Sequence, residues 1–181
     1  MRPLHRLDPL DGAEVVNVVI EVPKGSGSKF KYDPATGAFG LHRSLPAGLL
    51  FPYDYGFIPS TLGEDGDPLD VLAFLDTNAF AGCVVKTRLL GVITGTQKGE
   101  RGGRVQNNIL LAAHLEAVSW TKTGSLRDIP PKLLDEIEFF FLSYRNFQGK
   151  EFRVTRRQDR VHARRLLRAG MRRFEHSQLS E

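Results

Sequence analysis

Apolar and polar positions along the chain indicate many short strands followed by two helices. The β-branched run VVNVVIEV over residues 15–22 predicts a buried strand. Polar and apolar residues alternate on both sides of a turn from Asp33-Pro34 to Gly37, which predicts a hairpin with Lys29 and Lys31 on one face. Further strands are expected within 82–95 and at 109–114, while prolines and glycines make 46–60 irregular or short-stranded.

The two helices are expected at the C-terminal end. The first should begin at Pro130-Pro131 and stop near Gly149, because apolar residues recur at helical spacing between them. The second should span 159–175, with an apolar stripe opposite arginines that repeat every four residues: Arg156, Arg160, Arg164, Arg168 and Arg172. Strands first and helices last favour an α+β fold, in which a small antiparallel sheet or barrel carries helices outside.

Composition is that of an ordinary globular protein: 41% of the 181 residues are hydrophobic and 25% are charged. One domain, 1–181, is expected, with an N-terminal extension at 1–12. The chain has no apolar run long enough for a membrane span, no signal-peptide pattern and only one cysteine, Cys83. A cytoplasmic location without a membrane partner is therefore expected.

The net charge of +4 comes from the C-terminal segment, where residues 151–181 hold nine arginines against four acidic residues. An arginine stripe opposite an apolar stripe is most often a solvated helix face. No aromatic residues interleave with these arginines, so nucleic acid is not an expected partner, although a basic binding module remains one alternative function.

Candidate chemistry concentrates in Asp65, Asp67 and Asp70, which fall within six residues. The intervening Gly66 and Pro68 exclude a regular helix and favour a tight turn. Three carboxylates this close repel one another unless a cation lies among them, and oxygen ligands suit hard divalent ions. The alternative is a solvated surface turn, since Asp, Gly and Pro are common turn residues. Apolar runs on both sides of the loop favour the metal site.

Glu21 interrupts the first predicted strand. A carboxylate is costly in a core, so this side chain should face either a functional cavity or water at a sheet edge. The strand pattern alone does not choose between the two.

Several motifs together resemble the soluble family I inorganic pyrophosphatases. They are E-V-P-K-G-S-G-x-K from Glu21, D-P-x-T-G from Asp33, Arg43, and P-x-D-Y-G-F-I-P-S-T-L-x-E-D-G-D-P-L-D-V from Pro52, followed by F-F-x-x-Y-R from Phe140. The similarity covers roughly residues 15 to 170. It implies a five-stranded, OB-like antiparallel β-barrel with two flanking C-terminal helices. It also implies Mg²⁺-dependent hydrolysis of pyrophosphate to two phosphates by a metal-activated water, with Mn²⁺ or another divalent ion as an alternative cofactor.

The resemblance also implies roles for individual residues. Those matching Asp65 and Asp70 ligate metal, and the one matching Asp67 accepts a proton from, or orients, a metal-bridging water. The match to Glu21 acts at the outer shell of the metals, and the match to Tyr55 supports the site. Phosphate oxygens are gripped by the residues that match Lys29, Arg43, Tyr144 and Arg145. A homo-oligomer is expected, although Phe139 and Ser143 stand where many hexameric members have interface histidines.

The chain departs from the family pattern around its metal sites. Lys31 stands where the family usually has Glu, and Phe51 where it usually has Tyr. By spacing, Thr94 or Thr96 replaces one metal-binding acid, Asn107 or Asn108 replaces a second, and Ile109 replaces a lysine. Glu100, in an expected hairpin tip, is the only acidic residue in that segment.

These departures predict that fewer metals bind, at Asp65 and Asp70, and that the ammonium of Lys31 substitutes for a missing cation. The alternative is that Lys31 points to solvent. A second alternative concerns function, namely a catalytically weakened or inactive homologue that binds phosphate or a phosphorylated ligand.

Overall fold

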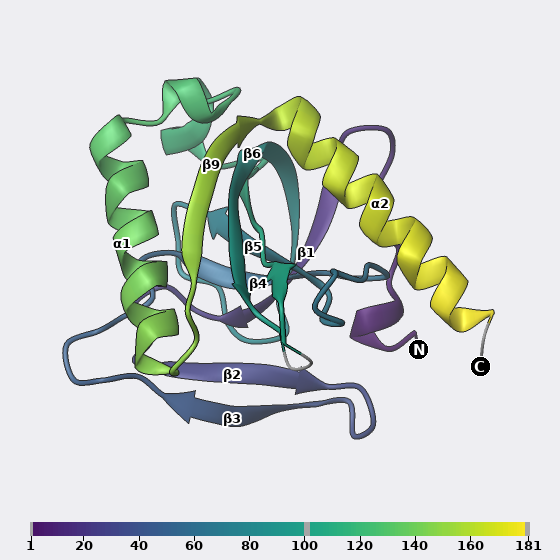
Figure 1. The fold of residues 1–181 in the computed structure, drawn as a ribbon. Helices are drawn as coiled ribbons and strands as arrows, with labels where there is room; N and C mark the ends of the chain where they lie inside the picture. The colour runs from purple at the N-terminus through teal and green to yellow at the C-terminus, as the bar shows by residue number, and fades with distance from the viewer. Residues whose placement is uncertain (1, 100–101, 180–181) are drawn as a thin grey trace.

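Five strands pair into a ring at the centre of the computed structural model, which describes residues 2–99 and 102–179 (Figure 1). In order around the ring these are β1 (Val16–Val22), β4 (Asp54–Ile58), β5 (Leu69–Phe74), β8 (Ile109–His114) and β6 (Val84–Lys98), which pairs again with β1. The ring and its flanking helices confirm the expected α+β, OB-like fold.

One pair in this ring contradicts the expected antiparallel barrel. β5 and β8 run parallel, with Asp70 opposite Ile109. After β5 the chain forms the long β6 and the β6–β7 hairpin. Only then does it form β8, which lies between β5 and β6 in the sheet. Such a crossover allows two strands to run in the same direction, whereas a short hairpin does not.

Three further pairings complete the sheets. β2 (Ser28–Asp33) and β3 (Ala38–Ser44) form a separate two-stranded ribbon, the hairpin that alternation predicted. β7 (Arg104–Gln106) extends a hairpin with β6, and the expected hairpin tip at Glu100 lies outside the described residues. β9 (Arg153–Asp159) also pairs with β6 and was not predicted, because its sequence RVTRRQD lacks an apolar face. Arg156 therefore lies on a strand and not on the terminal helix.

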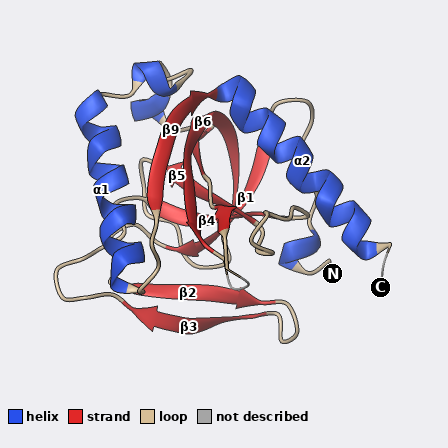
Figure 2. Cartoon of the chain, in the orientation of Figure 1, coloured by secondary structure: helices blue, strands red, loops and turns tan. Residues whose placement is uncertain are grey.

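The two predicted helices are present as α1 (Pro131–Phe147) and α2 (Arg160–Gln178), and three short 3₁₀ turns precede them (Figure 2). The turns are η1 (Leu4–Arg6), η2 (Val118–Trp120) and η3 (Leu126–Asp128). The Asp159 side chain caps α2 by accepting from the backbone N–H of His162 at 3.0 Å. No helix in the described part of the chain is long and apolar enough to cross a membrane.

Alternate residues of the central strands pack toward different helices. Leu72 and Phe74 of β5 belong to the cluster that contains Ile137, Phe140 and Phe141 of α1. Val71 and Ala73 belong to the cluster that contains Ala163 and Leu167 of α2. Because side chains on a strand alternate between faces, α1 and α2 hold β5 from opposite sides. They thereby fix the start of β5, where Asp70 lies.

Candidate active site

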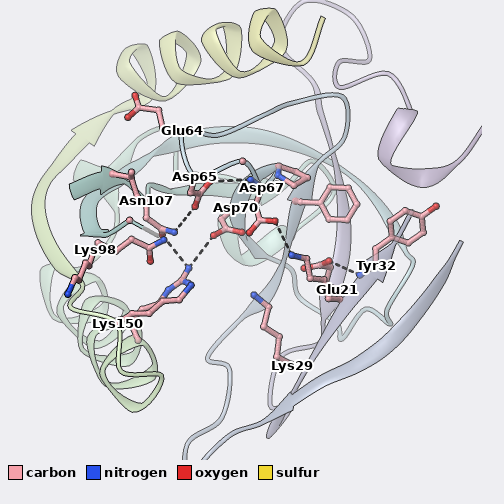
Figure 3. Close-up of a pocket in the computed structure, with 18 of the residues that line it drawn as sticks. Glu21, Lys29, Tyr32, Glu64, Asp65, Asp67, Asp70, Lys98, Asn107 and Lys150 are labelled. Carbon is pink, nitrogen blue, oxygen red and sulfur yellow. Dashed lines mark hydrogen bonds and ion pairs between the residues drawn. The ribbon is translucent and has the colours of Figure 1, made fainter. Parts of the chain in front are cut away.

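A pocket of about 900 Å³ lies where the β2–β3 ribbon, the loop before β5, the β6–β7 hairpin and the end of α1 meet (Figure 3). Its acidic lining residues are Glu21, Glu64, Asp65, Asp67 and Asp70. Its basic lining residues are Lys29, Lys31, Lys98, Arg145 and Lys150. Among the described residues the two sets are equal in number, so the side chains largely compensate one another's charge.

The loop that carries the three aspartates is a tight turn, as its composition predicts. The backbone N–H of Gly63 donates to the carbonyl of Asp67 at 2.7 Å. Gly66 has a φ of 87°, in the left-handed region that favours glycine. A Cβ on Gly63 would lie 2.7 Å from Asp65 Oδ1 and 3.1 Å from the carbonyl oxygen of Asp67, so a side chain there would displace the Asp65 carboxylate.

The buried hydroxyl of Thr61 connects the two ends of this loop by hydrogen bonds. Thr61 donates to the carbonyl of Ile58 at 2.6 Å and accepts from the backbone N–H of Leu69 at 3.1 Å. These bonds link the end of β4 to the start of β5. Buried polar groups nearly always find such partners, and here they fix the loop on the sheet.

Helix α2 holds the same loop from outside. The backbone N–H of Leu62 donates to the carbonyl of Gly170 at 3.0 Å, and Arg173 Nε donates to the carbonyl of Leu62 at 2.8 Å. Gly170 is close-packed, since a Cβ there would lie 2.7 Å from Leu69 Cδ1. The arginine-rich helix therefore supports the acidic loop in addition to presenting a charged outer face.

Asp65 and Asp70 are joined through two other side chains. Asn107 Nδ2 donates to Asp65 Oδ2 at 3.0 Å, and Arg145 Nη2 lies 3.3 Å from Asn107 Oδ1 and 3.4 Å from Asp70 Oδ2 (Figure 3). Partial burial, with the negative charges of Asp70 and Asp67, raises the pKa of Asp65. Arg145 is 6% exposed and lies in the middle of this network.

Lys31 lines the pocket and its ammonium points to the acidic loop, although almost half of the side chain is exposed. Its ammonium lies 2.9 Å from Asp67 Oδ1. Partial burial opposes the charge of Lys31, but the hydrogen bond and charge of Asp67 outweigh it, together with the charges of Glu21 and Asp70, and raise the pKa of Lys31. The hypothesis that this lysine faces the acidic residues agrees with the geometry.

Glu21 is buried and faces the pocket, which excludes the water-facing edge position. Its carboxylate accepts the backbone N–H of Tyr32 at 2.9 Å. Burial raises the pKa of Glu21, while the charge of Lys29 opposes that shift.

Lys29 forms no ion pair within the described part of the chain. Its ammonium lies 5.1 Å from the centre of the Tyr55 ring and is directed toward the space around Asp70 (Figure 3). Burial lowers the pKa of Lys29, and the charge of Asp70 partly counteracts this. An ammonium without a carboxylate partner is available to an anionic ligand.

Three residues that the resemblance implied lie outside the pocket lining: Arg43, Tyr55 and Tyr144. Arg43 pairs with Lys29 across the β2–β3 ribbon, and only Lys29 of this pair lines the pocket. Tyr55 and Tyr144 are at most 2% exposed and pack in the core around Phe51. Burial, together with the nearby Asp70 carboxylate, raises the pKa of the Tyr55 hydroxyl well above the ordinary value.

The structure also resolves the segment where two acids of the family pattern are missing. Gln97 and Asn107 line the pocket. Thr94 bonds to Thr155 instead, and Thr96 accepts from Arg104, so neither threonine reaches it. Asn108 Oδ1 accepts the N–H of Gly95, and Ile109 is buried in the core.

Sequence reasoning missed Gln97, Lys98 and Lys150. The N–H of Asn107 bonds to the carbonyl of Gly95, and Gln97 pairs with Val105, which puts Gln97 and Asn107 on one face of the hairpin. The alternation of residues along β6 carries this signal, but only once the register with β7 is known. Lys150 follows the turn that ends α1, where no pattern marks it.

Two parts of the pocket differ in how well they fit a divalent cation. Asp65 and Asp70 line the pocket with Gln97 and Asn107, and the buried Gln97 Oε1 has no hydrogen-bond partner among the described residues. Carboxylate and amide oxygens are the ligands that Mg²⁺ and Ca²⁺ prefer, so a cation fits here. At Asp67 the Lys31 ammonium already holds the carboxylate, and a cation does not fit there.

Carboxylates alone do not complete a metal site in the described part of the chain. Across residues 2–99 and 102–179, no three His, Cys, Asp or Glu side chains converge as a metal-binding group. A cation at Asp65 and Asp70 would therefore need the amide oxygens to complete its coordination.

Comparison with known proteins gives consistent matches over nearly the whole chain. A profile described as inorganic pyrophosphatase matches residues 18–175. The inorganic pyrophosphatase of Thermus thermophilus is 39% identical over 165 residues, which cover 90% of this chain and 91% of that protein. The inorganic pyrophosphatase of Synechocystis is 37% identical over 147 residues, 81% of this chain and 84% of that protein.

Solved structures give the same result. The crystal structure of the Thermus thermophilus inorganic pyrophosphatase superposes with a TM-score of 0.87 at 38% identity, covering 96% of this chain and 99% of that one. That of the Neisseria gonorrhoeae enzyme gives 0.84 at 29% identity, covering 93% and 96% of the two chains.

Proposed function

Because the chain belongs to the inorganic pyrophosphatase family and hydrolyses inorganic pyrophosphate to two phosphates, we propose that the reaction takes place in the pocket between the acidic loop and the β2–β3 ribbon. The observation that carries this proposal is that Asp65, Asp67 and Asp70 line the same pocket as the ammonium of Lys29, which has no ion-pair partner among the described residues. Carboxylates suit a cation and a proton, and an ammonium suits a phosphate oxygen.

A divalent cation, Mg²⁺ in the first instance, would be held by Asp65 and Asp70 with help from the amide oxygens of Gln97 and Asn107. When bound, it neutralises charge on the phosphates and makes water more acidic. Arg145 positions Asp70 and Asn107 through its Nη2 atom, and the turn of the loop positions Asp65.

The remaining roles belong to the chain's own acid and base groups. The Asp67 carboxylate, exposed at the pocket mouth, accepts the proton of the attacking water. Lys29 binds an oxygen of the phosphate that leaves, where negative charge increases as the bond breaks. Glu21 stays in the pocket wall and keeps Lys29 oriented by its charge.

Phosphate release from pyrophosphate tests this placement. With Mg²⁺ present, Asp67→Asn should lose at least about 100-fold in kcat, since general-base contributions are of that order. Glu116→Gln makes the same type of exchange at an exposed site outside the pocket and should keep wild-type activity. EDTA should abolish release and added Mg²⁺ should restore it.

Wild-type activity in Asp67→Asn would remove the proposed role of this carboxylate. No release by the wild-type protein at any metal concentration would instead favour a homologue that binds phosphate without hydrolysing pyrophosphate.

We also propose that the protein is a homo-oligomer. Phe139 and Phe147 on α1 are 70% and 60% exposed, and a contact between copies would remove this apolar surface from water. Light scattering after size-exclusion chromatography should give a mass that is a multiple of the chain mass, and a monomer would contradict the proposal.

A further inference from the structure

The contact between Lys31 and Asp67 joins two separate parts of the pocket. Lys31 comes from β2 of the ribbon and Asp67 from the acidic loop, 36 residues away, and their charged atoms are 2.9 Å apart. The two side chains are 45% and 60% exposed. An exposed ion pair of this kind contributes little to stability, so the contact needs another explanation.

The surroundings of the Lys31 ammonium provide an explanation for this contact. The carboxylates of Glu21 and Asp70 line the same pocket and also favour the charged form of the Lys31 ammonium. A cluster of carboxylates requires positive charge among its members, and at this point a lysine already supplies it. The side chain thus occupies the place and meets the electrostatic need that a metal ion would otherwise have.

A divalent ion and the ammonium cannot share this place. Mg²⁺ requires close, nearly octahedral oxygen ligands, and the ammonium takes up one Asp67 oxygen at hydrogen-bond distance. The ammonium would also repel a neighbouring dication. On the other side, Asp70 pairs with Arg145, which is anchored on Asn107 as well, and the Gln97 oxygen has no partner in the described part of the chain.

We propose that Lys31 is a built-in substitute for a divalent cation beside Asp67, so that this chain holds its metal only on the Asp65–Asp70 side of the pocket. The inference rests on the proposed placement of the reaction in this pocket. It assigns to Lys31 the task of neutralising the substrate's charge next to the attacking water, a task that a lysine performs at any metal concentration.

Metal counting tests this directly, and it requires no activity. Bound Mn²⁺ per chain is measured by equilibrium dialysis, with free Mn²⁺ read by electron paramagnetic resonance. The proteins are the wild type, Lys31→Glu, and the matched control Lys122→Glu. The control changes the net charge equally at an exposed lysine outside the pocket. Lys31→Glu should bind one more Mn²⁺ than the wild type, and Lys122→Glu should bind the same number as the wild type.

The added ion should depend on Asp67. The double variant Lys31→Glu with Asp67→Asn should return to the wild-type count. Equal counts in wild type and Lys31→Glu would overturn the proposal, as would an equal gain in Lys122→Glu.

A neutral replacement of Lys31 separates the effect of its charge from a folding defect in Lys31→Glu. In Lys31→Gln the affinity of the pocket for Mn²⁺ should rise by about tenfold, because the repelling charge of Lys31 is gone. An unchanged affinity would contradict the proposal. A wild type that hydrolyses pyrophosphate while these counts stay equal leaves the function intact and removes only the role of Lys31.

Discussion

Arg145 Nη2 lies 3.4 Å from Asp70 Oδ2, and the two residues are 75 positions apart in the sequence. The side chains are 7% and 22% exposed, so this is a largely buried ion pair. The same guanidinium nitrogen lies 3.3 Å from Asn107 Oδ1. One residue at the end of α1 therefore fixes an acid of β5 and an amide that precedes β8.

Replacing this arginine should damage both stability and activity. Arg145→Met leaves Asp70 without its cation and should cost about 3 kcal/mol in the free energy of unfolding, since breaking a buried pair is expensive. Arg145→Lys keeps the charge but loses the planar guanidinium, so its stability and activity should fall between those of the wild type and of Arg145→Met. Urea unfolding and kcat/KM for pyrophosphate measure the effects, and wild-type values for Arg145→Met would exclude the positioning role.

The ammonium of Lys29 should matter for binding the substrate phosphate. Lys29→Met should lower kcat/KM for pyrophosphate by about 10- to 100-fold, the equivalent of one hydrogen bond to a charged group. Lys24→Met is the matched control, because the Lys24 ammonium lies over the Tyr53 ring and does not line the pocket. Equal losses in the two variants would indicate a general effect of charge and not a specific contact.

Gly56 permits the close approach of β4 to β1. A Cβ at this position would lie 1.9 Å from the carbonyl oxygen of Val19 and 2.9 Å from Ile20 Cα, and backbone atoms cannot move aside cheaply. Gly56→Ala should destabilise the protein by about 3 kcal/mol or more. Gly40→Ala should change stability by less than about 0.5 kcal/mol, because its Cβ would meet no atom within 4 Å. Thermal and urea unfolding compare the two variants.

Asp54 should make stability depend on pH away from the active site. The residue is 1% exposed, and its Oδ1 accepts the N–H groups of Lys24 and Ala79 at 3.3 Å each. Burial raises the pKa of Asp54 above the ordinary 3.8. The folded state therefore binds this proton more tightly than the unfolded chain. Its stabilising contribution is complete below pH 3.8 and is lost as pH rises through the raised pKa.

Asp54→Asn removes this titration and keeps the acceptor oxygen. Relative to wild type, the variant should gain stability between pH 4 and pH 7 in urea unfolding. A difference between the two proteins that stays constant with pH would show that Asp54 does not titrate in that range.

Local patterns were sufficient for most elements of the fold. β1, the β2–β3 ribbon, β8 and both helices were predicted, because each depends on the alternation or helical spacing of adjacent residues. The parallel pairing of β5 with β8 depends on the order in which distant strands assemble. β9 was missed because it contributes backbone hydrogen bonds to β6 and almost no apolar side chains.

Neighbouring residues are enough to define the acidic turn, since Gly66 and the spacing of the aspartates shape that loop locally, and they mark Lys31 as a base among acids. The contacts of each carboxylate depend on how distant elements pack. Lys31 reaches Asp67 across 36 residues, and Gln97 enters the pocket because the register of β6 with β7 turns it there. Side-chain partners of this kind are set by the packing of separate elements, which no short stretch of sequence encodes.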